Sequence, residues 1–198
     1  MIDRYTAIQA ILRRVNPEDL VLSTTGMISR EVFVTSDRSG NFYMIGSMGL
    51  LSSFGLGLAL QFPEKKVYIL EGDGSALMSL GSLPLIATES PNNLFHIILD
   101  NESYESTGAQ PSISSKVNLD EIATSSGYPH VARAEDLESL ECVLSDCDAN
   151  AGPHLILVKS GIAPVDGIPR IPHPPTEIRD RFKDWVKPAS SSKPKPAH

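Results

Sequence analysis

Short runs of apolar residues recur along the chain, separated by segments long enough to form helices. The runs contain few polar positions, which is typical of strands buried on both faces of a parallel sheet. We expect strands at residues 20–23, 42–45, 67–70, 94–99, near Val131, and at 155–158.

The segments between these runs have the hydrophobic spacing of helices. We expect helices at residues 3–15, from about 50 to 60, at 76–89, from about 118, at 135–147 and at 177–186. No repeat of fixed period interrupts this alternation. The predicted fold class is therefore α/β, a three-layer sandwich with a mostly parallel central sheet covered by helices on both faces.

The length of 198 residues fits one domain with its own hydrophobic core. After Ser160 the composition becomes rich in proline, and residues 187–198 combine proline, serine and lysine. We expect residues 1–186 to form the domain and residues 187–198 to be a disordered tail.

The charge balance is acidic, with 17 Lys and Arg against 24 Asp and Glu and a net charge of −7. This balance argues against nucleic acid as a partner, because such proteins usually present a basic face. The first residues lack the basic and then apolar run of a secretion signal, and no apolar stretch approaches the ~20 residues that span a bilayer. We therefore expect a cytoplasmic protein that does not bind membranes.

The two cysteines, Cys142 and Cys147, lie five positions apart in a predicted helix. A redox or metal-binding pair would be one interpretation, but no second cluster of ligands lies nearby in the sequence. We expect two reduced thiols, buried or half-buried.

Polar residues follow two of the apolar strands, where α/β proteins place their ligands. Gly72-Asp73-Gly74-Ser75 follows one strand and Asp100-Asn101 follows the next. If these strands are neighbours, Asp73 and Asn101 emerge side by side and can share a Mg²⁺ ion. Ser75 opens the following helix, where free amide groups favour a phosphate. The alternative is a tight turn at Asp73 and an ordinary cap at Asn101.

This pair of segments resembles the cofactor motif of thiamine diphosphate-dependent enzymes. The resemblance implies a Mg²⁺ ion bound by the Asp73 carboxylate, the Asn101 amide oxygen and the backbone carbonyl of Ser103, with Ser75 on the diphosphate. The usual motif ends in two asparagines, whereas this chain has Asp100 at the first of these positions.

Two further segments match the same family. In Gly46-Ser47-Met48-Gly49, Met48 corresponds to the bulky apolar residue that holds the cofactor in its bent form, although by itself it could be core filler. Thr24-Thr25-Gly26 resembles another segment that touches the cofactor. The resemblance implies the following cofactor-binding residues: Thr24, Thr25, Gly26, Gly46, Ser47, Met48, Gly72, Gly74, Ser75, Asn101, Ser103 and Tyr104.

The chain looks closest to the cofactor-diphosphate half of phosphonopyruvate and sulfopyruvate decarboxylases. Family members need a glutamate carried by a separate pyrimidine-binding domain, for which this chain has no room. The resemblance therefore implies one subunit of a hetero-oligomeric enzyme, active only with a pyrimidine-domain partner. Its reaction would convert sulfopyruvate to sulfoacetaldehyde, or phosphonopyruvate to phosphonoacetaldehyde, with release of CO₂.

A doubly anionic substrate requires a local cation in this acidic chain. Arg30 is the candidate because it follows the Thr24-Thr25-Gly26 segment, with a surface charge as its alternative. Tyr104 and Glu105 follow the metal ligands, either on a lid over the substrate or as structural residues. His96 lies within an apolar strand, so we expect a core residue.

Two other functions compete with decarboxylation. A carboligase subunit of the acetolactate synthase type would keep the cofactor and join the aldehyde unit to a second carbonyl group. A scaffold subunit would keep the fold without binding anything. A dinucleotide-binding domain is disfavoured, because no Gly-x-Gly-x-x-Gly turn follows a strand.

Overall fold

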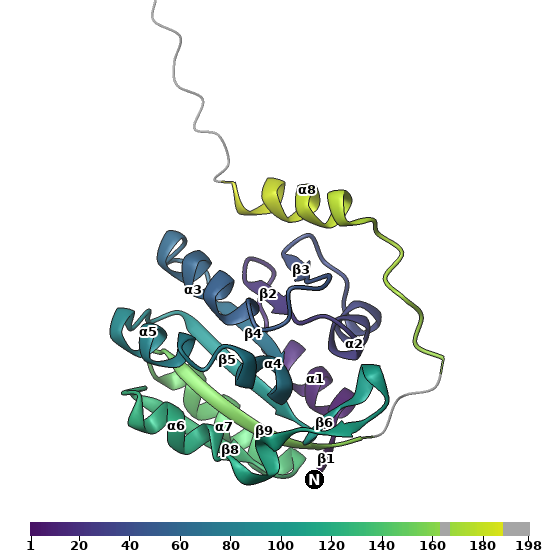
Figure 1. The fold of residues 1–198 in the computed structure, drawn as a ribbon. Helices are drawn as coiled ribbons and strands as arrows, with labels where there is room; N and C mark the ends of the chain where they lie inside the picture. Colours follow the sequence, from purple (N-terminus) through teal and green to yellow (C-terminus); the bar gives the residue numbers. More distant parts are fainter. Residues whose placement is uncertain (163–166, 188–198) are drawn as a thin grey trace, which may run out of the picture.

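A parallel sheet forms the centre of the computed structural model, which describes residues 1–162 and 167–187 (Figure 1). The strand order is β1-β9-β5-β4-β2-β3, and β8 pairs with β9 beside β1. The strands are β1 (Ile2–Asp3), β2 (Leu20–Ser23), β3 (Asn41–Tyr43), β4 (Val67–Gly72), β5 (Leu94–Asp100), β8 (His130–Ala134) and β9 (His154–Gly161). The central strands β2, β4, β5 and β9 are buried almost throughout, because their apolar runs face helices on both sides.

Helices cover both faces of the sheet, which confirms the predicted three-layer α/β fold (Figure 1). One hydrophobic cluster joins the sheet to α1 (Arg4–Leu12), α2 (Met27–Thr35) and α7 (Leu137–Ala149). A second cluster joins the other face to α3 (Leu51–Gln61), α5 (Ser82–Glu89) and α6 (Leu119–Ser125). Within the described ranges, no helix combines the length and the apolar character that a membrane span requires.

The strand order reverses between β2 and β4. From β2 the chain passes through α2 to β3 on one side, and then returns through α3 to β4 on the other side. Connections that diverge in this way open a crevice beyond the carboxyl ends of the two strands. The segments that follow β2 and β4 therefore meet at this crevice.

Several elements differ from the prediction. The helix expected at residues 76–89 is two helices, α4 (Asp73–Met78) and α5. Pro84 explains the break, since proline fits only the first turn of a helix and α5 must begin close before it. Helix α2 was not predicted, because Val32, Val34 and Thr35 are β-branched and favour strands.

The polar segment after β5 contains short regular elements. Strands β6 (Ser103–Tyr104) and β7 (Gln110–Pro111) form an antiparallel pair, with the 3-10 helix η1 (Glu105–Thr107) between them and η2 (Ile113–Lys116) after them. This hairpin folds back over the end of β4, so that Ser112 and Ser114 reach Asp73.

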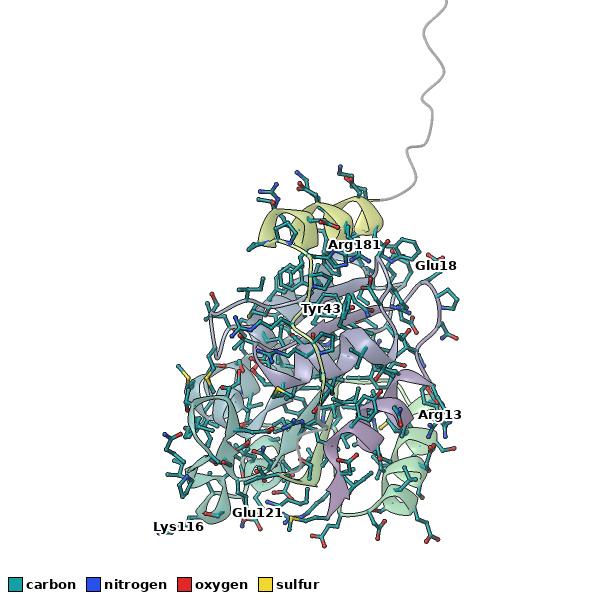
Figure 2. The ribbon with its side chains drawn as sticks, turned by 90° about the vertical axis from the view of Figure 1, so that its right-hand side faces the viewer. Arg13, Glu18, Tyr43, Lys116, Glu121 and Arg181 are labelled. Atoms are coloured by element: carbon teal, nitrogen blue, oxygen red, sulfur yellow. The ribbon has the colours of Figure 1, made fainter. Side chains whose placement is uncertain are left out.

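The last described helix, α8 (Pro175–Val186), covers the edge of the sheet at β3, close to its predicted range (Figure 1). Phe182 packs against Phe42 with the ring centroids 5.4 Å apart. Figure 2 shows Arg181 of α8 facing the part of the sheet that carries Tyr43, and both side chains bind the Asp37 carboxylate. The tail predicted at residues 187–198 lies outside the described residues from 188 onward.

A row of four aromatic rings crosses the sheet near the amino ends of its strands. Tyr68, Phe95, His154 and His130 occupy adjacent positions on β4, β5, β9 and β8, with successive centroids 4.6, 4.9 and 5.0 Å apart. His154 is buried, and its Nε2 lies 3.1 Å from the carbonyl oxygen of Asn150. Burial lowers the pKa of this imidazole.

Both cysteines are free thiols on α7. Cys147 is buried, as expected, and burial raises its pKa to about 11. Cys142 is exposed, so the expectation of a buried or half-buried thiol is wrong there, because this position of the amphipathic helix faces away from the sheet.

Candidate active site

A pocket occupies the crevice at the carboxyl ends of β2, β4 and β5. The segments after these strands line it, together with Arg4 from α1 and the hairpin that follows β5. Every predicted cofactor-binding residue lines this pocket except Gly46 and Ser47. Those two belong to the loop that carries Met48, which itself lines the pocket. The structure therefore brings the four motif segments together.

Asp73 lines the pocket directly after β4, with 2% of its surface exposed. Its Oδ2 accepts hydrogen bonds from the hydroxyl groups of Ser112 and Ser114, the latter at 3.0 Å. Burial raises the pKa of Asp73, and the nearby charge of Asp100 raises it further, against the effect of the two hydroxyl groups. Such a carboxylate gains from a bound cation, which would offset both the burial and the repulsion.

The donors around Asp73 fit a magnesium ion. Strands β4 and β5 are paired, with Gly72 opposite Leu99, so Asp73 and Asn101 do leave neighbouring strands as predicted. Among the described residues, no three His, Cys, Asp or Glu side chains converge as a metal cluster. A site here would therefore combine one carboxylate with amide, carbonyl and phosphate oxygens, the ligand set that Mg²⁺ accepts.

Asn101 has a fixed orientation beside Asp73. Its Nδ2 donates to Glu105 Oε2 at 3.2 Å, and its Oδ1 accepts from the backbone amide of Ser103 at 3.1 Å. Glu105 is in turn held by Arg4, which also pairs with the fully buried Glu31 at 2.7 Å. Arg4 itself is almost completely buried, and its ion pairs raise its pKa against the effect of burial. Sequence reasoning missed Arg4, which carries no local motif.

Asp100, the departure from the usual motif, makes an ion pair. Its Oδ2 lies 2.7 Å from Lys159 Nζ, while its Oδ1 lies 2.8 Å from the Ser114 hydroxyl oxygen and accepts from the Glu102 amide at 3.1 Å. Hydrogen bonds to Asp100 and Glu102 raise the pKa of Lys159 despite burial. Lys159 thus compensates the charge of Asp100, which is separated from Asp73 by the Ser114 hydroxyl group. Lys159 was missed, although a lysine directly after the apolar run of β9 and still within the buried strand is a signal of a buried partner.

The loop that carries Met48 approaches the start of α4 closely. A Cβ atom at Gly74 would lie 3.1 Å from the Met48 methyl group and would clash with the Tyr104 ring. Gly74 thus lets the Tyr104 ring and the Met48 thioether pack directly against the backbone at the start of α4, where any larger side chain would clash.

The hydroxyl group of Ser75 is already engaged within the protein. It donates to Glu71 Oε1 at 2.6 Å and accepts from the amide of Gly49 at 3.0 Å. Glu71 is fully buried and pairs with His96 at 2.9 Å. His96 is buried, as expected of a core residue.

The two predicted substrate residues have different places. Glu105 lines the pocket, where it binds Arg4 and Asn101. Arg30 is half-buried on α2 and does not belong to the pocket lining that the structure describes. Its role stays a prediction.

Comparison with known proteins identifies similar sequences. A family model described as "Thiamine pyrophosphate enzyme, C-terminal TPP binding domain" matches residues 24–158. The chain is 38% identical over 185 residues to the sulfopyruvate decarboxylase subunit beta of Methanocaldococcus jannaschii, covering 93% of this chain and 97% of that one. It is 40% identical over 185 residues to the phosphonopyruvate decarboxylase of Streptomyces hygroscopicus, covering 92% of this chain and 45% of that one.

The chain thus spans about half the length of the phosphonopyruvate decarboxylases and nearly all of the beta subunits. Among solved structures, the fold is similar to one from Mycobacterium smegmatis described as a thiamin diphosphate-dependent enzyme. The TM-score is 0.71 at 18% identity, covering 82% of this chain and 32% of that one.

Proposed function

The chain belongs to the thiamine pyrophosphate enzymes, as their C-terminal cofactor-binding domain, and we propose that it is one subunit of a thiamine diphosphate- and Mg²⁺-dependent 2-oxo acid decarboxylase. The observation that carries this proposal is the meeting of Met48, Asp73 and Asn101 in one pocket. The names of the similar proteins support the reaction and suggest sulfopyruvate or phosphonopyruvate as substrate.

Three oxygen ligands of this chain would hold the metal ion. They are the Asp73 carboxylate, the Asn101 amide oxygen and the backbone carbonyl of Ser103. Glu105 supports this arrangement, because the hydrogen bond that it accepts from Asn101 Nδ2 leaves Oδ1 as the oxygen available for a cation. The diphosphate would contact the segments after β2 and β4, which include Thr24, Thr25, Gly26, Gly72 and Gly74, and the backbone of Ser75.

The cofactor, when bound, supplies a nucleophilic carbon and an electron sink for the carboxylate that leaves as CO₂. This chain contributes position and shape. The Met48 side chain lines the pocket next to Tyr104 and would support the bent form of the cofactor. Apolar side chains of Met27, Ile28 and Leu99 line the same pocket and would exclude water from it.

A pyrimidine-domain partner would complete the site. The only glutamate in the described pocket lining is Glu105, and it is bound to Arg4, so it is not free to activate a cofactor. Four apolar side chains of the segments around the pocket, which we call the apolar rim, are more than half exposed: Ile45, Leu50, Met78 and Ile113. Exposed apolar residues of this kind, gathered around an incomplete site, favour a protein partner. The similar chains named as beta subunits support a hetero-oligomer.

The substrate anion would be bound largely by that partner. Within the described pocket lining, Arg4 is the one cation, and Glu31 and Glu105 already compensate its charge. From this chain, Arg30 stays the candidate for an additional contact.

Co-production with a pyrimidine-domain chain tests the proposal. We expect calorimetry on the purified pair to detect thiamine diphosphate binding that requires Mg²⁺ and is lost in Asp73→Ala. The pair should release CO₂ and a free aldehyde from sulfopyruvate or phosphonopyruvate. Unchanged binding in Asp73→Ala would contradict the cofactor site, and absence of binding would favour a scaffold subunit.

A carboligase subunit is the second candidate. It shares the cofactor site, and the acceptor pocket that distinguishes it would lie partly on the partner. Product analysis separates the two functions, because a product with a new carbon–carbon bond would replace the free aldehyde.

A further inference from the structure

The one proton of the Ser75 hydroxyl group is already donated within the protein, and a diphosphate oxygen could only accept a proton from it. A serine hydroxyl donates once and accepts twice. Here Oγ donates to Glu71 at 2.6 Å and accepts from the Gly49 amide at 3.0 Å and from Thr24 Oγ1 at 3.4 Å. Ser75 is 1% exposed, so water does not compete for these bonds. The hydroxyl group therefore joins three segments of the pocket: the ends of β2 and β4 and the loop before α3.

Behind Ser75, the hydrogen bonds continue through the buried core. Glu71 Oε2 lies 2.9 Å from His96 Nε2, and His96 Nδ1 lies 3.3 Å from the Tyr128 hydroxyl. Burial raises the pKa of Tyr128, so its hydroxyl group keeps a proton to donate. Both carboxylate oxygens of Glu71 have partners, as a carboxylate at this depth requires. The four residues form a continuous chain from Tyr128 to Ser75.

The loop that carries Met48 lies at the Ser75 end of these hydrogen bonds, and its backbone conformation needs stabilising contacts from outside the loop. Gly46, Ser47 and Gly49 all have positive φ values, of 74°, 50° and 90°. Positive φ is unfavourable for serine, and a Cβ atom at Gly49 would lie 3.0 Å from Met78. The bond from the Gly49 amide to Ser75 fixes the residue next to Met48.

We propose that Tyr128, His96, Glu71 and Ser75 form a positioning relay that fixes the Gly49 amide and thereby the place of Met48 in the cofactor pocket. Ser75 then acts through Gly49 and Thr24, and its hydroxyl group is not a ligand of the diphosphate. The link to the cofactor rests on the proposed function. The effect on the loop does not, which allows the two to be tested separately.

Amide hydrogen exchange of the full-length chain without cofactor tests the loop. We expect exchange at Gly49 to become at least tenfold faster in Ser75→Ala and in Glu71→Gln, while amides of β5 keep their protection. Ser52→Ala is the matched control, because Ser52 is equally buried and, among residues 1–162 and 167–187, its hydroxyl group bonds to Ser79 and Ser82 alone. If Glu71→Gln fails to fold, His96→Gln takes its place. Unchanged exchange at Gly49 in Ser75→Ala or in the second variant overturns the relay.

Cofactor affinity in the assembled pair tests the consequence for binding. We expect the dissociation constant of the cofactor to rise roughly tenfold in Ser75→Ala and in Glu71→Gln. The double variant should show no further loss of affinity, because both substitutions break the same chain of hydrogen bonds. A loss in Ser75→Ala alone would identify its hydroxyl group as a direct ligand and would refute the proposal. If Asp73→Ala still binds the cofactor, the proposed function fails, whereas faster exchange at Gly49 would still support the relay.

Discussion

The side-chain amide of Asn101 donates to the Glu105 carboxylate at 3.2 Å, which fixes the orientation of this amide in the pocket that Asp73 also lines. Glu105 holds its position through Arg4, which also neutralises Glu31 on α2. A residue near the start of the chain thus supports the predicted metal site.

Arg4→Met should destabilise the protein strongly. Glu31 is completely buried and would lose its cation, and breaking such a pair costs about 3–5 kcal/mol. Urea unfolding measures the loss, and the additional change Glu31→Gln should recover part of it. Arg13→Met is the control, because Arg13 forms an exposed ion pair with Glu141 and should matter little. Equal effects of the two arginine substitutions would refute this account.

Lys159→Met should also be destabilising, through Asp100. The Asp100 carboxylate is 2% exposed and would remain without its cation, at a cost of about 3 kcal/mol. The double variant with Asp100→Asn should be more stable than Lys159→Met alone, because it removes the unpaired charge. Denaturant midpoints of the four proteins give the coupling energy, and strictly additive changes would contradict the pairing.

Gly74→Ala should damage the pocket. The added methyl group would push against Tyr104 and Met48, and overpacking of this kind costs about 1–3 kcal/mol. Thiamine diphosphate binding to the assembled pair should weaken as well. Gly57→Ala is the matched control, since Gly57 is exposed on α3 with open space around it. That change should stabilise the chain by about 0.5–1 kcal/mol.

Stability should fall as the pH drops below about 6.5, in part because of His154. Burial lowers the pKa of this imidazole in the folded chain, so the unfolded chain binds more protons in acid. The contribution of His154 is therefore complete above the unfolded pKa and is lost below it. Urea midpoints at pH 7 and pH 5 should differ less in His154→Phe, which keeps a ring between Phe95 and His130. An unchanged difference would show that other groups dominate.

The sequence predicted those parts of the site that follow directly from strand ends. Asp73 and Asn101 come after continuous apolar runs, and adjacent parallel strands bring such positions together. The supporting contacts could not be predicted in this way. Arg4 lies 27 positions from Glu31 and 101 positions from Glu105, and only the packing of α1 against the sheet and α2 joins them.

Local sequence patterns were misleading for two further features, helix α2 and the contacts of Ser75. Helix α2 resembles a strand in composition. It is nevertheless helical, because tertiary packing of Ile28 and Val32 outweighs their weak helix preference. The serine at position 75 matches a phosphate-binding position, but its bond to Glu71 depends on a buried carboxylate whose partner, His96, is on another strand.

The apolar rim distinguishes the folding of this chain from its assembly with a partner. Its four side chains belong to neither hydrophobic cluster, so both cores are complete before any partner arrives. We expect the chain to fold as a monomer and then to dock as a preformed body, with an assembly rate that scales with partner concentration. Without a partner, the chain would be a folded monomer whose exposed apolar rim promotes self-association at high concentration.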